Sequence, residues 1–155
     1  MKDTKTIVLA VLVLGALSAG VYFLAEKEYT PNPEPIVTEP TPVISGDTAN
    51  LVSLSVSAGQ KLSGVVTITG ALTGAYFFEA NARGMLLDAN KNLVLQFPIG
   101  ATSEDWMTTE AVAFSATVSV PVALSGPGYL RIANDNPSGE AVNDRFIDVP
   151  VVFNQ

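Results

Sequence analysis

Apolar and polar residues alternate along much of the chain from residue 51 onward. The longest regular example runs from Phe114 to Val120, where the intervening residues are serine and threonine. A repeat of two residues places apolar side chains on one face of a β-strand and polar side chains on the other. Strands are therefore predicted at residues 52–56, 66–69, 76–80, 85–88, 93–97, 114–120, 128–133 and 147–153.

Turn-forming residues separate these segments. The polar run at residues 88–92 predicts a hairpin connection, and glycine, proline and asparagine interrupt the chain at residues 125–128 and 134–139. No segment from Leu51 onward keeps a helical period over several turns. About seven short strands separated by such turns are typical of an immunoglobulin-like antiparallel β-sandwich, so the sequence predicts an all-β domain of that kind.

The first 25 residues predict a membrane helix that precedes this domain. Two lysines come before residues 6–25, which carry no charge, and about 20 residues form a helix about 30 Å long, the thickness of the hydrocarbon core of a bilayer. The lysines favour a cytoplasmic N-terminus, with the rest of the chain outside the membrane. A cleaved signal peptide is the alternative, because Ala16, Ser18 and Gly20 are small residues that suit a signal peptidase. Both interpretations export the domain.

Residues 26–46 predict an extended linker. Half of the ten prolines of the chain lie between Pro31 and Pro42. Proline fixes φ and has no amide donor, so this stretch favours the polyproline II conformation. The chain therefore divides into an anchor or signal peptide at 1–25, a proline-rich linker at 26–46 and a sandwich domain at 47–155.

Composition and charge exclude several functions. The chain has no cysteine and no histidine, which removes disulfide scaffolds, Cys/His zinc sites, thiol nucleophiles and triads that need an imidazole base. A formal charge of −7 makes binding to a nucleic-acid backbone unfavourable. No cofactor is expected.

Glu79 follows two aromatic residues in a predicted strand. A carboxylate that faces a core needs a partner, so Glu79 either faces solvent or pairs with a cation such as Arg131 or Arg83. The favoured interpretation is structural pairing. The functional alternative is a general acid, for which no second carboxylate is visibly placed.

Trp106 lies in a loop-like stretch at residues 100–110, beside Glu104 and Asp105. An exposed tryptophan at this place could stack on a sugar ring or anchor a partner protein. The favoured interpretation is a loop residue that folds back to cap the sandwich.

Residues 134–144 are rich in oxygen donors, and Asp135, Glu140 and Asp144 offer carboxylates for a calcium ion. The spacing is not that of an EF-hand, and Asn and Asp before proline and glycine are common turn formers, so a turn is favoured over a metal site. Trp106, Asp135 and Asp144 are therefore weak candidates for binding.

Several short motifs occur in a characteristic order: GVVTITG at 64–70, FEA at 78–80, LLD at 86–88, DWM at 105–107, FSA at 114–116, DNPSG at 135–139 and VPVVF at 149–153. In this order and spacing, residues 62–153 resemble the immunoglobulin-like domain of bacterial spore-germination proteins, of the GerM-associated type. The resemblance implies a non-enzymatic β-sandwich in an exported or envelope protein. It implies neither a particular ligand nor a role in sporulation.

The sequence therefore predicts a non-enzymatic module that is held at the cell membrane through residues 6–25, or secreted if that segment is cleaved. Its expected partner is a protein of the bacterial envelope or the cell wall. The alternative is a structural subunit that joins copies of itself, or a larger envelope complex, through its sheet edges.

Overall fold

The computed structural model describes residues 41–154 and has an all-β fold. Three single-turn 3-10 helices accompany the strands. The elements are β1 (Ser45–Gly46), η1 (Thr48–Asn50), β2 (Leu51–Leu54), β3 (Lys61–Leu62), β4 (Val65–Thr73), η2 (Gly74–Tyr76), β5 (Asn81–Asp88), β6 (Leu93–Ala101), β7 (Ala111–Ser119), β8 (Gly126–Ala133), η3 (Ala141–Asn143) and β9 (Phe146–Phe153). Between residues 41 and 154 no helix is long and apolar enough to cross a membrane. The membrane helix predicted at residues 6–25 lies outside the described part of the chain.

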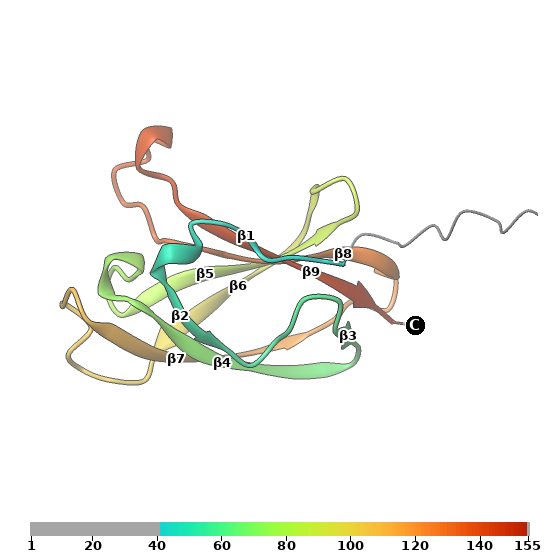
Figure 1. Cartoon of the computed structure of the whole chain (residues 1–155), viewed down its shortest axis with the longest axis horizontal. Coiled ribbons are helices and arrows are strands. Elements are labelled where there is room, and N and C mark those ends of the chain that lie inside the picture. Colours follow the sequence, from blue (N-terminus) through green and yellow to red (C-terminus); the bar gives the residue numbers. More distant parts are fainter. Residues whose placement is uncertain (1–40, 155) are drawn as a thin grey trace, which may run out of the picture. The chain divides into compact units, whose positions relative to one another are not determined.

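The strands form one curled sheet in the order β1-β9-β8-β5-β6-β7-β4-β2. Its neighbouring strands are antiparallel, except that β3 runs parallel to β9. β6 pairs with β5 along its length but reaches β7 only through Gly100 and Ala101. At this narrow contact the sheet bends back on itself. In Figure 1, β5, β8 and β9 therefore lie above β2, β4 and β7.

The alternation in the sequence explains which side chains the curled sheet buries. In β7 the buried residues are Val112, Phe114, Ala116 and Val118, and exposed or half-buried small residues lie between them. β9 also buries every second residue from Ile147 to Phe153, and of the residues between them only Asp148 is buried as well. Both halves of the sheet contribute to one apolar core. The predictions of an all-β domain and of these two strands are confirmed.

The predicted strand at residues 76–80 is wrong. The chain instead forms η2 and then a tight turn, in which Glu79 and Ala80 have positive φ angles of 47° and 62°. Tyr76 and Phe77 are consecutive and both buried, whereas a strand would place their side chains on opposite faces of the sheet. Gly74 sits so close to the Thr108 carbonyl oxygen that a Cβ atom there would lie 1.9 Å from it. A side chain at position 74 would therefore collide with the neighbouring loop.

The first predicted strand, at residues 52–56, is shorter than expected. β2 ends at Leu54, and a second short piece, β3, follows at the other edge of the sheet beside β9. β1 lies within the stretch that composition assigns to the linker, and it pairs with β9 through Ser45 and Gly46. The structure therefore has nine strands where the sequence predicts about seven, and the folded unit begins before residue 47.

The polar hairpin between β5 and β6 forms as predicted. The Asp88 carboxylate accepts hydrogen bonds from the backbone amides of Asn90 and Asn92 at 2.9 and 2.8 Å. The Asn92 side chain also donates to it, and these bonds hold the pKa of Asp88 below its ordinary value. Lys91 takes a left-handed φ of 63° at the tip. The hairpin is thereby fixed in one conformation, which places the Lys91 side chain.

Candidate functional site

Three connections lie together at one end of the sheet: residues 74–80, 102–110 and 134–145, here called the loop end. They join β4 to β5, β6 to β7 and β8 to β9, and Figure 1 shows them on the left, away from the C-terminus. Loops on a rigid β scaffold commonly carry binding residues. The loop end is therefore the candidate functional site of the domain.

Backbone hydrogen bonds connect the three loops. The Gly74 amide donates to the Glu110 carbonyl oxygen at 3.1 Å, which joins the first loop to the second. The Asp135 amide donates to the Tyr76 carbonyl oxygen at 3.1 Å, which joins the first loop to the third. These bonds fix the loops relative to one another, so the loop end is one pre-formed surface.

Tyr76 anchors the loop end to the start of the domain. Its side chain is fully buried, and its hydroxyl donates to the Asp47 carboxylate at 3.1 Å. The Asn50 amide donates to both oxygens of that carboxylate at 2.9 Å. Burial, and then the neighbouring Asp47 charge, raise the pKa of Tyr76, so the phenol stays protonated and remains a donor.

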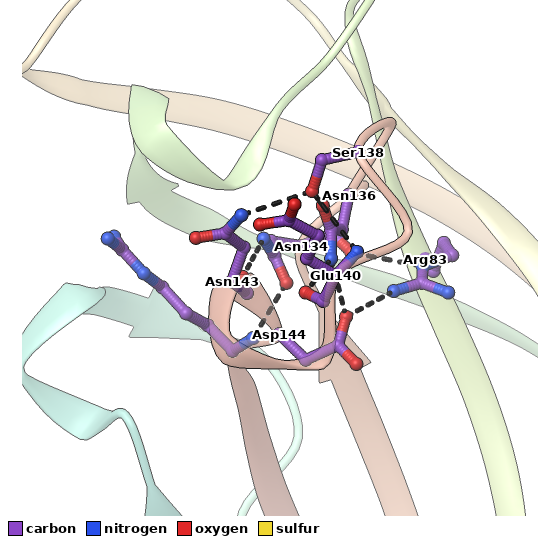
Figure 2. Close-up of polar contacts among 8 residues, drawn as sticks. Arg83, Asn134, Asn136, Ser138, Glu140, Asn143 and Asp144 are labelled. Carbon is purple, nitrogen blue, oxygen red and sulfur yellow. Dashed lines mark hydrogen bonds and ion pairs between the residues drawn. The ribbon is translucent and has the colours of Figure 1, made fainter.

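The loop at 134–145 is organised around Asn134, which is only 7% exposed. Its side-chain amide donates to the Asn143 carbonyl oxygen at 3.0 Å, and its side-chain oxygen accepts from the Arg145 amide at 2.8 Å (Figure 2). Arg83 reaches in from β5, and its Nε donates to the Asn134 carbonyl oxygen at 3.0 Å. A single buried amide therefore closes the base of this loop.

Further polar contacts occupy the tip of the same loop (Figure 2). The Asn136 amide donates to the Asp144 carboxylate at 3.0 Å, and an Arg83 nitrogen lies 3.7 Å from that carboxylate. The Ser138 hydroxyl donates to Asn136 at 2.6 Å and accepts from the Asn143 amide at 3.1 Å. Asp144 is thus held by donors within the protein, which agrees with the turn interpretation.

The calcium alternative finds no support in this geometry. Residues 41–154 contain no group of three acidic side chains placed to hold a metal ion. The three candidate carboxylates, Asp135, Glu140 and Asp144, therefore do not form one site. Asp135 instead lines an open cavity of about 460 Å³ beside the loop end. The cavity also presents Asn81, Arg83 and Gln96, which together can hydrogen-bond a polar ligand.

Trp106 is partly buried and packs against the core, where the capping interpretation expects it. The exposed large apolar residue of this loop is its neighbour Met107, at 81% exposure. Phe78 and Val142 are the exposed large apolar residues of the other two loops, at 40% and 86%. None of the three was predicted from the sequence, because Phe78 and Met107 each follow another large apolar residue and no periodicity shows which of the two faces solvent.

The predicted pairing of Glu79 with Arg131 or Arg83 is wrong. Glu79 lies exposed in the turn after η2, and within the described residues no ion pair includes it. Because residues 76–80 do not form a strand, its carboxylate never faces the core. Arg131 instead pairs with Asp148, the residue directly opposite it on β9.

Asp148 is fully buried on the outer side of β9, and two cations share it. Arg131 donates to its two oxygens at 2.6 and 2.9 Å, and Lys91 donates at 2.8 Å. Burial alone would raise the pKa of Asp148, but these hydrogen bonds and charges outweigh it and hold the pKa below its ordinary value. The Arg131 guanidinium also lies 4.0 Å from the centre of the Phe146 ring. This ion cluster was not predicted, because only the register of β8 and β9 brings its members together.

Comparison with known proteins returns no similarity: no family model matches the chain, and no curated protein or solved structure matches it. The structure by itself defines the class as an all-β domain built on a curled, mainly antiparallel sheet. Its candidate site is a surface of hydrogen-bonded loops.

Proposed function

We propose that residues 41–154 form an immunoglobulin-like β-sandwich that serves as a non-enzymatic binding or protein-interaction module. In this proposal residues 6–25 hold it at the membrane, outside the cytoplasm, and the proline-rich linker separates it from the bilayer. If residues 6–25 are cleaved, the same module is secreted. The family resemblance of residues 62–153 belongs to this proposal.

The strand order supports the immunoglobulin-like assignment. The segment at residues 51–62 is divided between the two halves of the sheet, because β2 pairs with β4 while β3 runs parallel to β9. One half then has the order β9-β8-β5 and the other β7-β4-β2, with β6 crossing between them. Two sheets that pack face to face over a shared apolar core are the defining feature of such sandwiches.

The exposed apolar residues of the loop end are the observation that carries the binding proposal. Phe78, Met107 and Val142 are 40%, 81% and 86% exposed, one in each loop. The loops that carry them are joined by backbone hydrogen bonds. Because these hydrogen-bonded loops are already ordered, their backbone loses little conformational freedom when a partner binds, which favours a binding surface over an incidental one.

The point at which the linker joins the domain also favours this surface. Pro42 lies beside Gly59 and Val152, near the end of β9 that is opposite the loop end. A tether attached there leaves the three loops at the far end of the domain. The sequence lacks histidine and cysteine, and Glu79 stands alone in its turn, which supports a binding role rather than catalysis.

Co-sedimentation tests the proposal. The full chain, in detergent micelles, is mixed with protein-free cell-wall sacculi or with envelopes that retain their proteins. We expect Met107→Ser combined with Val142→Ser to reduce the pelleted fraction at least tenfold with one of the two materials. The matched control is Val65→Ser on β4, which is 72% exposed but lies outside the loop end. Equal losses in the control and the loop variant, or pelleting with neither material, would contradict the proposal.

A second candidate function is self-assembly through a sheet edge. From Leu93 to Ile99, β6 does not pair with β7, so this edge of the strand is open. Leu93 and Val94 are 56% and 43% exposed there. An apolar edge strand is a template for another strand. Concentration-dependent association in sedimentation velocity, abolished by Val94→Lys, would favour this function, whereas a monomer at all concentrations would exclude it.

A further inference from the structure

The acidic residues of the domain gather at the loop end. Residues 41–154 contain ten acidic and five basic residues. The basic residues at the loop end are Arg145, in the third loop, and Arg83, which reaches in from β5. Seven of the ten acidic residues lie in the three loops, which gives the loop end an excess of five negative charges. These seven are Glu79, Glu104, Asp105, Glu110, Asp135, Glu140 and Asp144.

The rest of the domain is electrically neutral. Its charged residues are the three acidic residues Asp47, Asp88 and Asp148 and the three basic residues Lys61, Lys91 and Arg131. Each of these three carboxylates accepts hydrogen bonds within the domain. The net charge of the domain therefore resides at the loop end. Charges closer together than the Debye length, about 10 Å at 0.1 M salt, act jointly on an approaching ligand.

Few of the charges at the loop end are compensated inside the protein. Arg83 lies 3.7 Å from the Asp144 carboxylate, and Asn136 donates to the same carboxylate (Figure 2). Among the described residues no other carboxylate of the loop end takes part in an ion pair. Nor does this part of the chain place three acidic side chains together for a metal ion. The compensating positive charge therefore has to come from several separate cations rather than from one bound metal ion.

The exposed apolar residues of the loop end lie among these carboxylates. Phe78 is followed directly by a glutamate, and Met107 comes two residues after an aspartate. Val142 lies midway between a glutamate and an aspartate of the third loop. Backbone hydrogen bonds join the loops, so the apolar side chains and the carboxylates belong to one ordered surface. A partner that covers the apolar groups therefore also meets the negative charge around them.

We infer that the loop end binds a cationic protein segment that carries apolar side chains among its lysine or arginine residues. This inference rests on the proposed function and names the chemistry of the partner. The apolar side chains of the segment pack on Phe78, Met107 and Val142, and its cations lie against the surrounding carboxylates. The same charge repels anionic polymers, anionic lipids and the loop end of a second copy, and a neutral sugar gains nothing from it.

Titration with synthetic peptides tests the inference. The probe is a fluorescent peptide, GKLKGKFKGKLK, whose anisotropy is measured against the full chain in non-ionic micelles, with empty micelles as the blank. We expect saturable binding that weakens at least tenfold when the peptide lysines are replaced by glutamine. Replacing its leucines and phenylalanine by serine should weaken binding at least tenfold as well. Raising the salt from about 50 mM to about 500 mM should also weaken binding, because salt screens the charges.

Charge variants of the protein locate the site. The triple variant Glu104→Gln/Asp105→Asn/Glu140→Gln removes three exposed carboxylates and should weaken binding of the lysine peptide at least tenfold. Binding that remains should depend less on salt. The matched control is Lys61→Glu on β3, an exposed position outside the loop end, which makes the net charge more negative by two. It should change binding less than twofold, because it leaves the charge at the loop end as it was.

An apolar variant tests the other half of the contact. Met107→Ser combined with Val142→Ser keeps every charge of the loop end and should weaken binding of the lysine peptide at least tenfold. The control Val65→Ser, on β4, should leave it unchanged. Both variants alter exposed side chains, so the domain should remain folded.

Several outcomes would overturn the inference. One is the absence of saturable binding at millimolar lysine peptide. Another is equally strong binding of the serine peptide, which would mean adsorption by charge alone, and a third is equally strong binding of the glutamine peptide. Tighter binding to Lys61→Glu would assign the effect to the total charge of the chain rather than to the loop end.

Co-sedimentation separates this inference from the proposed function. With envelopes that retain their proteins, the triple charge variant should lose pelleting as Met107→Ser/Val142→Ser does. If the apolar variant alone loses pelleting, with envelopes or with bare sacculi, the loop end binds a partner that is not cationic, so the proposed function stands and the inference is wrong. If both variants pellet like the wild-type protein, the proposed function itself has failed.

Discussion

Removing Arg131 should destabilise the domain more than removing any exposed cation does. In Arg131→Met the fully buried Asp148 carboxylate loses two charge-assisted hydrogen bonds, at 2.6 and 2.9 Å, and keeps only the bond from Lys91. Breaking a buried ion pair by removing one partner costs about 3–5 kcal/mol. Because Lys91 remains, we expect a loss near the lower end of that range, about 3 kcal/mol of the free energy of unfolding.

The other members of the ion cluster give graded expectations. Lys91→Met should cost about 1 kcal/mol, because its side chain is 45% exposed and Asp148 keeps both bonds from Arg131. The double variant Arg131→Met/Asp148→Asn should cost less than the sum of its two single changes by at least about 1.5 kcal/mol, since no buried charge is then left without a partner. Arg145→Met, an exposed cation outside the cluster, should change stability by less than about 0.5 kcal/mol.

The pH dependence of this loss has a definite sign. The pKa of Asp148 is lower in the folded domain than in the unfolded chain, so its contribution to stability is present above about pH 4 and is lost as the pH falls through the folded pKa. In Arg131→Met most of that lowering disappears. The difference in stability between the wild-type protein and Arg131→Met should therefore shrink between pH 7 and pH 3.

Urea unfolding of the full chain in micelles measures these effects. Trp106 is the single tryptophan of the chain, so its fluorescence reports on the folded domain alone. A loss of about 3 kcal/mol corresponds to a decrease in Tm of about 10–20 °C for a domain of this size. If Arg131→Met costs less than about 1 kcal/mol, or if its loss is the same at pH 3 and pH 7, the cluster behaves as a surface ion pair and the reasoning is refuted.

Two further changes test the packing of the loop end. Gly74→Ala places a Cβ atom 1.9 Å from the Thr108 carbonyl oxygen and should cost more than about 2 kcal/mol of the free energy of unfolding. The control Gly139→Ala meets open space at a φ of +67° and should cost about 1 kcal/mol. Similar shifts in Tm for the two variants would contradict the close contact at Gly74. Tyr76→Phe removes the hydrogen bond to Asp47 at 3.1 Å and should cost about 1 kcal/mol by urea unfolding, and an unchanged midpoint would mean that this bond contributes nothing.

Local patterns predicted the elements in which one face meets the core. β7 and β9 follow their alternation closely, because a strand with one apolar and one polar face has a single favourable orientation in a sheet. The β5–β6 hairpin was equally visible, since Asp88 and Asn92 close it through contacts only four residues apart. Prediction failed at residues 76–80, where the chain forms η2 and a tight turn and where the Tyr76 carbonyl oxygen accepts from the amide of the distant residue Asp135.

The candidate site was less predictable than the fold. Loop residues obey no periodicity, so the sequence named Trp106 but could not show that it packs inward and leaves Met107 exposed. The sequence indicated that Glu79 and Arg131, as charged residues on predicted strands, each need either a partner of opposite charge or contact with solvent. Their partners, however, depend on which strands are neighbours, and this is a property of the whole sheet.

By itself, the sequence determined that the domain is all-β, that its long strands alternate between core and solvent, and that catalysis through cysteine or histidine is excluded. These properties follow from local periodicity and composition. Only the tertiary structure decided that Lys91, Arg131 and Asp148 form one cluster, that three loops share hydrogen bonds, and that prolines from β8 and β9 line one groove. The physical reason is that register between distant strands is set by the packing of the entire curled sheet, which no short stretch of sequence encodes.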